Sequence, residues 1–168
     1  MVVYLTILLA FVISSASSLC AQEKSVGKTN EQEQMARLVT PILDPVAKAY
    51  TRCGPQPAHG DKCGLNQAYE NAVYAVNRLF GNKSRASTHA LVVLMSFYLG
   101  EATADDIVHN VTKRGKAAVP YLLKYQDHPP VVPNRRYPDA IRSPEEVRKE
   151  DFKTALEFIK AGKVSGVD

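Results

Sequence analysis

The sequence has 168 residues, three cysteines and a formal net charge of +4 at neutral pH. A chain of this length suits a single domain with one core. The positive charge is a mild excess and does not amount to the dense basic surface of a nucleic-acid-binding protein, so we expect no nucleic-acid partner.

The beginning of the chain has the layout of a secretory signal peptide. An uncharged apolar run over residues 1–13 is followed by small and polar residues up to Ala21. We therefore predict that residues 1–21 are removed on export, that the protein is secreted or periplasmic, and that no membrane span remains. An uncleaved membrane anchor is the alternative, because the uncharged stretch approaches the length of a span. Residues 22–30 are polar and without periodicity, which predicts a flexible leader.

The first helical pattern places apolar residues from Met35 to Tyr50 at spacings of three and four. Pro41 and Pro45 interrupt this pattern, and a proline inside a helix removes a hydrogen bond and crowds the preceding turn. The sequence therefore predicts a short helix, a kink and a second helix that ends near Arg52.

A loop rich in glycine and proline follows, bounded by Cys53 and Cys63. In an exported chain we expect these two cysteines to form a disulfide, which stabilises the fold by about 3 kcal/mol in the loop-entropy model. His59 lies between them and Asp61 is a weak further ligand, so a zinc site is the alternative for this loop.

Two longer helices are predicted next. The first runs from Leu65 to a stop at Gly81. The second is capped by Ser84 or Ser87 and is apolar on all sides as far as Leu99. Apolar residues all around a helix are typical of a buried central helix.

A shorter helix is expected after Gly100, because Thr103 with Asp106 three residues later matches a capping box. Gly115 closes this helix. The element after it starts at Val119 and Pro120, since proline is tolerated in the first turn of a helix, and its two leucines are expected to face inward.

This central stretch, over residues 88–127, resembles a HEAT-like helical repeat. The residues that carry the resemblance are Gly115, Ala118, Val119, Pro120, Leu122 and Leu123. The resemblance implies an antiparallel helix pair used for protein contacts. An ordinary helical bundle is the alternative, because repeat proteins need three or more copies and no second clear copy occurs.

The last part of the chain combines an extended segment with a final helix. Residues 127–138 are rich in proline and predict an extended path along the surface or across a groove. Ser143, Pro144 and Glu146 then match a capped helix start, and Gly162 ends the helix. These patterns predict an all-α, single-domain helical bundle.

The expected bundle has five to seven helices over residues 31–162, followed by a tail over residues 163–168. No strand pattern of comparable strength occurs in the sequence.

Residues able to perform acid, base or nucleophilic chemistry occur without a recognisable motif. The sequence lacks a G-x-S-x-G elbow, an H-E-x-x-H pair and a glycine-rich phosphate loop. Ser87, Thr88 and His89 stand together, but a helix cap accounts for them. Asp127 and His128 similarly suit a turn. We therefore expect no catalytic residues and no cofactor.

Metal binding is an alternative for one helix. Asp105, Asp106 and His109 share a helical surface and could supply two or three ligands. The simpler interpretation is that the two aspartates offset the helix dipole and that the histidine is exposed.

Basic side chains and tyrosines gather in the second half of the sequence. Because tyrosine and arginine are enriched at protein interfaces, we predict a contact surface for a protein partner, in particular an acidic one, with a solvated face as the alternative. The predicted contact residues are Lys113, Arg114, Lys116, Arg135, Arg136, Tyr137 and Arg142.

The function expected from the sequence is therefore non-catalytic protein binding outside the cytoplasm, as in an adaptor, inhibitor or immunity-like protein. The alternative is a small secreted enzyme or metal-binding protein that uses the neighbourhood of His109 or of Cys53, His59 and Cys63.

Overall fold

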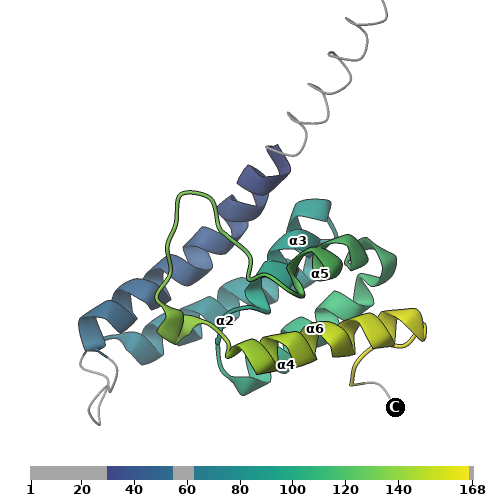
Figure 1. Cartoon of the computed structure of the whole chain (residues 1–168). Helices are drawn as coiled ribbons and strands as arrows, with labels where there is room; N and C mark the ends of the chain where they lie inside the picture. The colour runs from purple at the N-terminus through teal and green to yellow at the C-terminus, as the bar shows by residue number, and fades with distance from the viewer. Residues whose placement is uncertain (1–29, 55–62, 167–168) are drawn as a thin grey trace, which may run out of the picture.

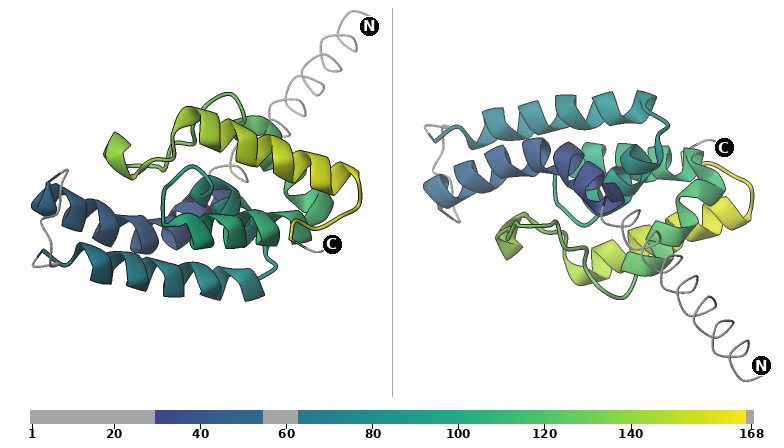
Figure 2. Two further views of the ribbon diagram at one scale, coloured as in Figure 1. Left: turned by 90° about the horizontal axis from the view of Figure 1, so that it is seen from below. Right: turned by 90° about the horizontal axis from the view of Figure 1, so that it is seen from above.

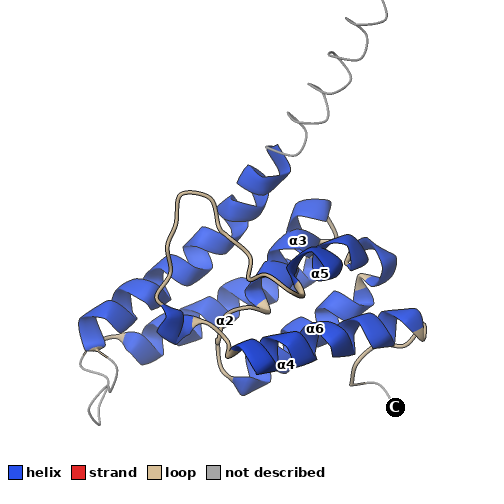
Figure 3. Cartoon of the chain, in the orientation of Figure 1, coloured by secondary structure: helices blue, strands red, loops and turns tan. Residues whose placement is uncertain are grey.

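The computed structural model describes residues 30–54 and 63–166. The predicted signal peptide, most of the predicted leader, and His59 and Asp61 lie outside these residues. Within the described part, six α-helices and two short 3-10 helices are present and no strand is found, which confirms the all-α single-domain bundle (Figure 3). The elements are the N-terminal helix (residues 30–53), α2 (Leu65–Gly81), α3 (Arg85–Leu94), α4 (Glu101–Lys113), η1 (Gly115–Ala117), α5 (Val119–Tyr125), η2 (Asp139–Ile141) and α6 (Glu145–Lys160).

The N-terminal helix is continuous through Pro41 and Pro45, so the predicted break in it is wrong. Both prolines are exposed, whereas the apolar residues before and after them are buried on one common face. Burial of that shared face outweighs the loss of two backbone donors. The buried residues of this helix are Met35, Val39, Ile42, Leu43, Val46 and Ala49.

The N-terminal helix and α2 form an antiparallel hairpin, seen side by side in Figure 1 and in both views of Figure 2. A disulfide between Cys53 and Cys63, with 5.4 Å between their Cα atoms, joins the two helices at the tip of the hairpin. This confirms the predicted cysteine pairing. Gly54, at φ 74°, ends the first helix as expected for a residue just past a helix end.

The centre of the bundle is α3, in which every residue from Ser87 to Leu94 is buried. Ser84 caps this helix, because its side chain accepts a hydrogen bond from the Ser87 amide at 3.1 Å. The helix ends at Leu94 rather than near Leu99, so the predicted length is wrong. The backbone of residues 96–98 instead pairs with residues 141–143, far along the chain.

Two predicted capping boxes are also wrong. Helix α4 begins at Glu101, directly after Gly100 at φ 96°, and Thr103 is buried within it. Helix α6 has Pro144 in the capping position, without a hydrogen bond from any side chain to its first turn. The starts of α4 and α6 are therefore determined by backbone geometry and packing. The polar residues that matched the capping motif do not cap either helix.

The remaining helices surround α3. Helices α2, α4 and α5 pack against it, and α6 packs over α4 and α5. Helices α4 and α5 contact α3 and α6 more than they contact one another. The HEAT-like resemblance stays a prediction. Leu122 is buried, but Leu123 is 52% exposed, so its predicted inward orientation is wrong.

The proline-rich segment between α5 and α6 arches across the N-terminal helix (Figure 1). Val132, Tyr137 and Ile141 are its buried anchors. The Tyr137 hydroxyl donates to Asp44 Oδ1 at 2.8 Å, and Arg135 Nε donates to Asp44 Oδ2 at 3.0 Å. One carboxylate of the N-terminal helix thus fixes the arch.

In the part of the chain that the structure describes, none of the helices is both long enough and apolar enough to cross a membrane.

Replacing both Cys53 and Cys63 by serine is expected to lower the free energy of unfolding by about 3 kcal/mol, because the closed loop restricts the unfolded chain. Urea titration of the oxidised protein and the double variant measures this difference. Reduction of the wild-type protein should reproduce the effect, and an unchanged midpoint in both experiments would contradict it.

Candidate functional site

The start of α6 is attached to the chain that leaves α3. Phe97 and Arg142 form an antiparallel bridge. The Tyr98 amide donates to the Ile141 carbonyl at 3.0 Å, and the Ser143 amide donates to the Ser96 carbonyl at 3.1 Å. This pairing fixes the position of residues 142–144, which form a wall shared by two hollows on the protein surface.

The first hollow, which we call the acidic groove, lies between α4 and α6 and has a volume of about 480 Å³. Two large apolar side chains of the groove are exposed to solvent, since Tyr98 is 46% and Val147 is 50% exposed. Its lining residues are Tyr98, Glu101, Ala104, Asp105, Ala140, Arg142, Ser143, Pro144, Val147 and Asp151.

The acidic groove carries three carboxylates, from Glu101, Asp105 and Asp151, and one cationic side chain, Arg142. Burial raises the pKa of Asp151, and the neighbouring carboxylates of Asp105 and Glu150 raise it further. Among the described residues, neither Asp105 nor Asp151 has an ion-pair partner. Arg142 already has other partners. Its guanidinium carbon lies 5.2 Å from the centre of the Phe97 ring, and its Nε lies 3.7 Å from an Asp139 oxygen.

The second hollow, which we call the arginine cavity, has a volume of about 550 Å³ and lies on the other side of the same wall. Its lining residues are Ser96, Asp127, Pro129, Asp139, Arg142, Ser143, Pro144, Glu145 and Arg148. It therefore combines side chains from α6, from the segment that follows α3 and from both ends of the connection between α5 and α6.

Two buried polar side chains stand in the wall of the arginine cavity. Arg148 is only 3% exposed, and its Nη1 donates to the carbonyls of Tyr125 at 2.7 Å and Gln126 at 3.2 Å. These are carbonyls at the end of α5, where a cation is favourable. The hydroxyl of Ser96 is buried and has no hydrogen-bond partner among the described residues.

A third cluster joins the N-terminal helix to α3 and α5. His89 is 2% exposed, its Nε2 is 2.8 Å from the Tyr125 hydroxyl, and its ring stacks on Tyr121 with 4.3 Å between centroids. Glu31 accepts a hydrogen bond from the Tyr121 hydroxyl and pairs with Arg85 at 3.1 Å. His89 Nδ1 is 3.3 Å from a Glu31 oxygen but lacks the geometry of a hydrogen bond.

Burial lowers the pKa of His89 to about 4 from its ordinary value of 6.5. The Glu31 carboxylate opposes this shift, whereas the positive charges of Lys124 and Arg85 add to it. His89 is therefore neutral in the folded protein near neutral pH, and its role in the cluster is to pack and to hydrogen-bond.

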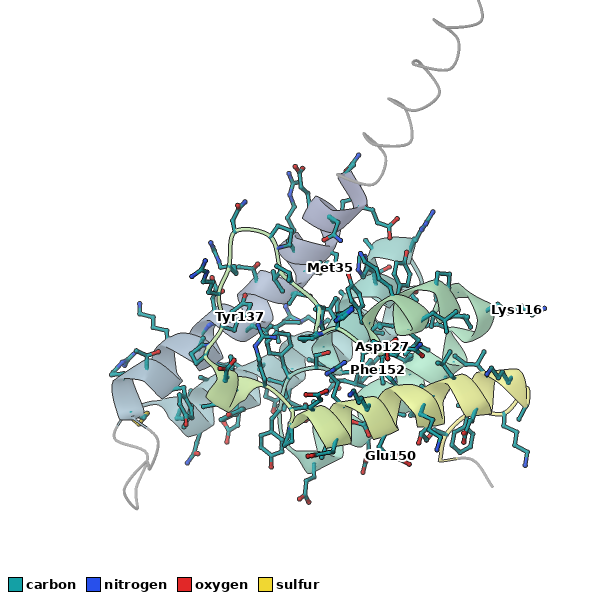
Figure 4. The ribbon with its side chains drawn as sticks, in the orientation of Figure 1. Met35, Lys116, Asp127, Tyr137, Glu150 and Phe152 are labelled. Carbon is teal, nitrogen blue, oxygen red and sulfur yellow. A yellow bond between two sulfur atoms is a disulfide. The ribbon has the colours of Figure 1, made fainter. Side chains whose placement is uncertain are left out.

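The predicted contact residues are spread over several elements. Figure 4 places Lys116 at one end of the molecule and Tyr137 on the other side of its centre. Arg114 donates to the carbonyls of Leu79 and Phe80 at the end of α2, and burial lowers its pKa. Tyr137 is only 7% exposed. The exposed members are Lys113, Lys116, Arg135 and Arg136, and their partner-binding role stays a prediction.

Other residues that the sequence suggested for catalysis or metal binding have structural contacts. The hydroxyl of Ser87 donates to the Leu79 carbonyl and that of Thr88 to the Ser84 carbonyl, so both serve the backbone. His109 Nδ1 bonds to the Ser165 carbonyl of the C-terminal tail. Among the described residues no group of three or more histidine, cysteine, aspartate or glutamate side chains is arranged to hold a metal.

Sequence reasoning named Asp105, Asp127 and Arg142 but missed Arg148 of the arginine cavity and Asp151 of the acidic groove. A signal for Arg148 was present, because it precedes Phe152 by four residues and Ala155 by seven on the apolar face of α6. Phe152 points from α6 into the bundle in Figure 4. A charged residue on such a face is buried in a special environment or forms a site.

No known protein family, curated protein or solved structure matches this chain. The two hollows at the start of α6 are therefore the features from which a function can be derived.

The buried neutral His89 makes the stability of the fold depend on pH. Because its folded pKa lies below the ordinary value, the unfolded chain takes up the proton first as the pH falls. Its contribution to stability is complete above pH 6.5 and is lost toward pH 4, with a total of up to about 3 kcal/mol.

In His89→Gln, urea unfolding between pH 7 and pH 4 should therefore lose less stability than in the wild type. His128→Gln, which changes an exposed histidine, is the matched control and should keep the wild-type slope. Equal slopes in all three proteins would show that His89 does not carry this dependence.

Proposed function

We propose that this protein is an exported, non-catalytic binding protein whose acidic groove holds a protein segment with a basic side chain beside an aliphatic or aromatic one. The observation that carries the proposal is the half-exposed pair Tyr98 and Val147 beside carboxylates that have no ion-pair partner among the residues that the structure describes. Apolar surface with a charged rim is the usual composition of an interaction site.

The apolar part of the groove supports burial of a partner side chain. Tyrosine combines a large ring with a hydroxyl and is enriched at protein interfaces. Here the backbone of Tyr98 is fixed, because its amide is bonded to the Ile141 carbonyl, and Val147 lies on α6. A partner would therefore bind between elements whose backbone is already ordered, with little loss of backbone freedom in this protein.

The charge of the groove supports a cationic partner. Asp105 raises the pKa of Asp151, which means that the two carboxylates repel one another in the folded protein. A lysine or arginine side chain placed between α4 and α6 would turn this repulsion into attraction. The acidic partner expected from the sequence would instead need basic residues that lie on α4, on η1 and in the segment between α5 and α6.

Export is supported by two features. The layout of residues 1–21 is that of a signal peptide. The disulfide between Cys53 and Cys63 is of the kind that persists in oxidising compartments.

Binding can be tested with a fluorescein-labelled peptide of alternating leucine and lysine, by fluorescence anisotropy on the oxidised full chain. The double variant Asp105→Asn with Asp151→Asn should bind about tenfold more weakly or worse, because a hydrogen bond to a charged group contributes about 1.5–3 kcal/mol. Salt should weaken the wild-type complex. The double variant should fold at least as stably as the wild type, because the repulsion is removed.

Asp106→Asn is the matched control, since Asp106 is exposed on the same helix but does not line the groove. Peptides in which glutamate replaces lysine, or serine replaces leucine, test charge and apolar contact separately. Wild-type binding that is equally strong for the glutamate peptide would overturn the proposal.

A further inference from the structure

We propose that the arginine cavity binds a free α-amino acid, with the ligand carboxylate against Arg148 and Ser96 and the ligand ammonium group toward Asp127. The two hollows share Arg142, Ser143 and Pro144, but Arg148, Ser96 and Asp127 do not line the acidic groove, so this site does not depend on the function proposed above.

Arg148 is the main recognition group for the carboxylate. It is 3% exposed, yet no carboxylate of the described residues lies within ion-pair distance of it. A buried charge without a counter-ion is costly unless a ligand balances it. Its Nη1 is held by the end of α5, so the guanidinium is oriented, while Nε and Nη2 have no hydrogen-bond partner in the described part of the chain.

Those two remaining nitrogens form one edge of the guanidinium fork. That edge matches the two oxygens of a carboxylate, which arginine binds through parallel hydrogen bonds. A carboxylate is therefore better suited to this position than a halide or another spherical anion.

Ser96 supplies a second unsatisfied group. Its hydroxyl is buried without a partner, whereas its carbonyl is already bonded to the Ser143 amide. Buried hydroxyls in folded proteins nearly always find a hydrogen-bond partner, so an unpartnered one in a cavity wall points to a ligand. Rotation of the hydroxyl lets it donate to a carboxylate oxygen.

The amino end of α6 adds to the preference for an anion. Pro144 and Glu145 line the cavity, and no side chain caps the first turn of this 16-residue helix. The unpaired amides and the positive end of the helix dipole favour a negatively charged group nearby.

The mouth of the arginine cavity favours a cation, in contrast to its buried wall. Asp127, Asp139 and Glu145 all line it and are exposed. Asp139 lies 3.7 Å from the Arg142 guanidinium, and Glu145 pairs with Lys149 at 2.6 Å, so each has a cationic neighbour. In the described part of the chain, the Asp127 carboxylate accepts only a hydrogen bond from the neighbouring Gln126 amide group, at 3.3 Å.

Asp127 is therefore the carboxylate available to a ligand cation. Figure 4 shows it near the centre of the molecule, above α6. Donors in the buried wall and carboxylates at the mouth together select a ligand with a negative and a positive end. A simple anion would be repelled on entry, whereas an α-amino acid satisfies both ends. The volume of about 550 Å³ is within the usual range for small-molecule sites.

Isothermal titration of the oxidised full chain with the common L-amino acids tests this proposal. At least one of them should bind ten or more times tighter than acetate, methylammonium and its own N-acetyl derivative, because each of these lacks one charged end. Acetate of equal affinity would show an anion site, and the N-acetyl derivative or a peptide ending in that residue would show a peptide-terminus site. Either result overturns the proposal, as does the absence of binding at about 10 mM.

Ser96→Ala and Asp127→Asn should each weaken binding about tenfold. The first variant removes one hydrogen bond to the ligand, and the second removes one nearby charge. Asp106→Asn lies outside both hollows and is the matched control. Arg148→Lys should abolish binding, and circular dichroism must show that it still folds, because Arg148 also holds the end of α5. Unchanged amino-acid affinity in both Ser96→Ala and Asp127→Asn would overturn the proposal, whether or not the Arg148→Lys variant folds.

The two proposals can fail separately. Loss of amino-acid binding in Ser96→Ala would leave peptide binding at Asp105 and Asp151 unchanged, since Ser96 does not line the acidic groove.

Discussion

Complete burial of α3 is the constraint on which the rest of this structure depends. All eight side chains from Ser87 to Leu94 are buried, so other helices must cover this one on every side. Helices α2, α4 and α5 pack directly on it, and α6 closes over α4 and α5. The polar residues at its start are accommodated because Ser87 and Thr88 bond to backbone carbonyls and His89 bonds to the Tyr125 hydroxyl.

The two hollows follow from how α6 is attached to this centre. The chain leaves α3 at Leu94 and pairs through residues 96–98 with residues 141–143. Helix α6 begins directly after that pairing, and its first turn separates the acidic groove from the arginine cavity. Arg148 has structural contacts with two carbonyls at the end of α5 and with the Phe152 ring, 5.9 Å from its guanidinium carbon, and these contacts also orient the guanidinium in the cavity wall.

Carboxylates of the N-terminal helix hold two tyrosines and two arginines that come from distant parts of the chain. Glu31 is bonded to Tyr121 and Arg85, and Asp44 to Tyr137 and Arg135. Each pairing satisfies a tyrosine hydroxyl whose ring is buried. Sequence spacing could not indicate these pairs, because about 90 residues separate each tyrosine from its carboxylate.

The sequence by itself determined the helical class, the disulfide and the buried character of α3, and it limited the cap of that helix to Ser84 or Ser87, because spacing, loop closure and a capping hydroxyl are local properties. Tertiary structure decided that the N-terminal helix continues through Pro41, that α3 stops at Leu94 and that α6 starts without a side-chain cap. It also brought Asp151 near Asp105, and Arg148 near Ser96. Those outcomes depend on surface buried between distant segments, which no local pattern records.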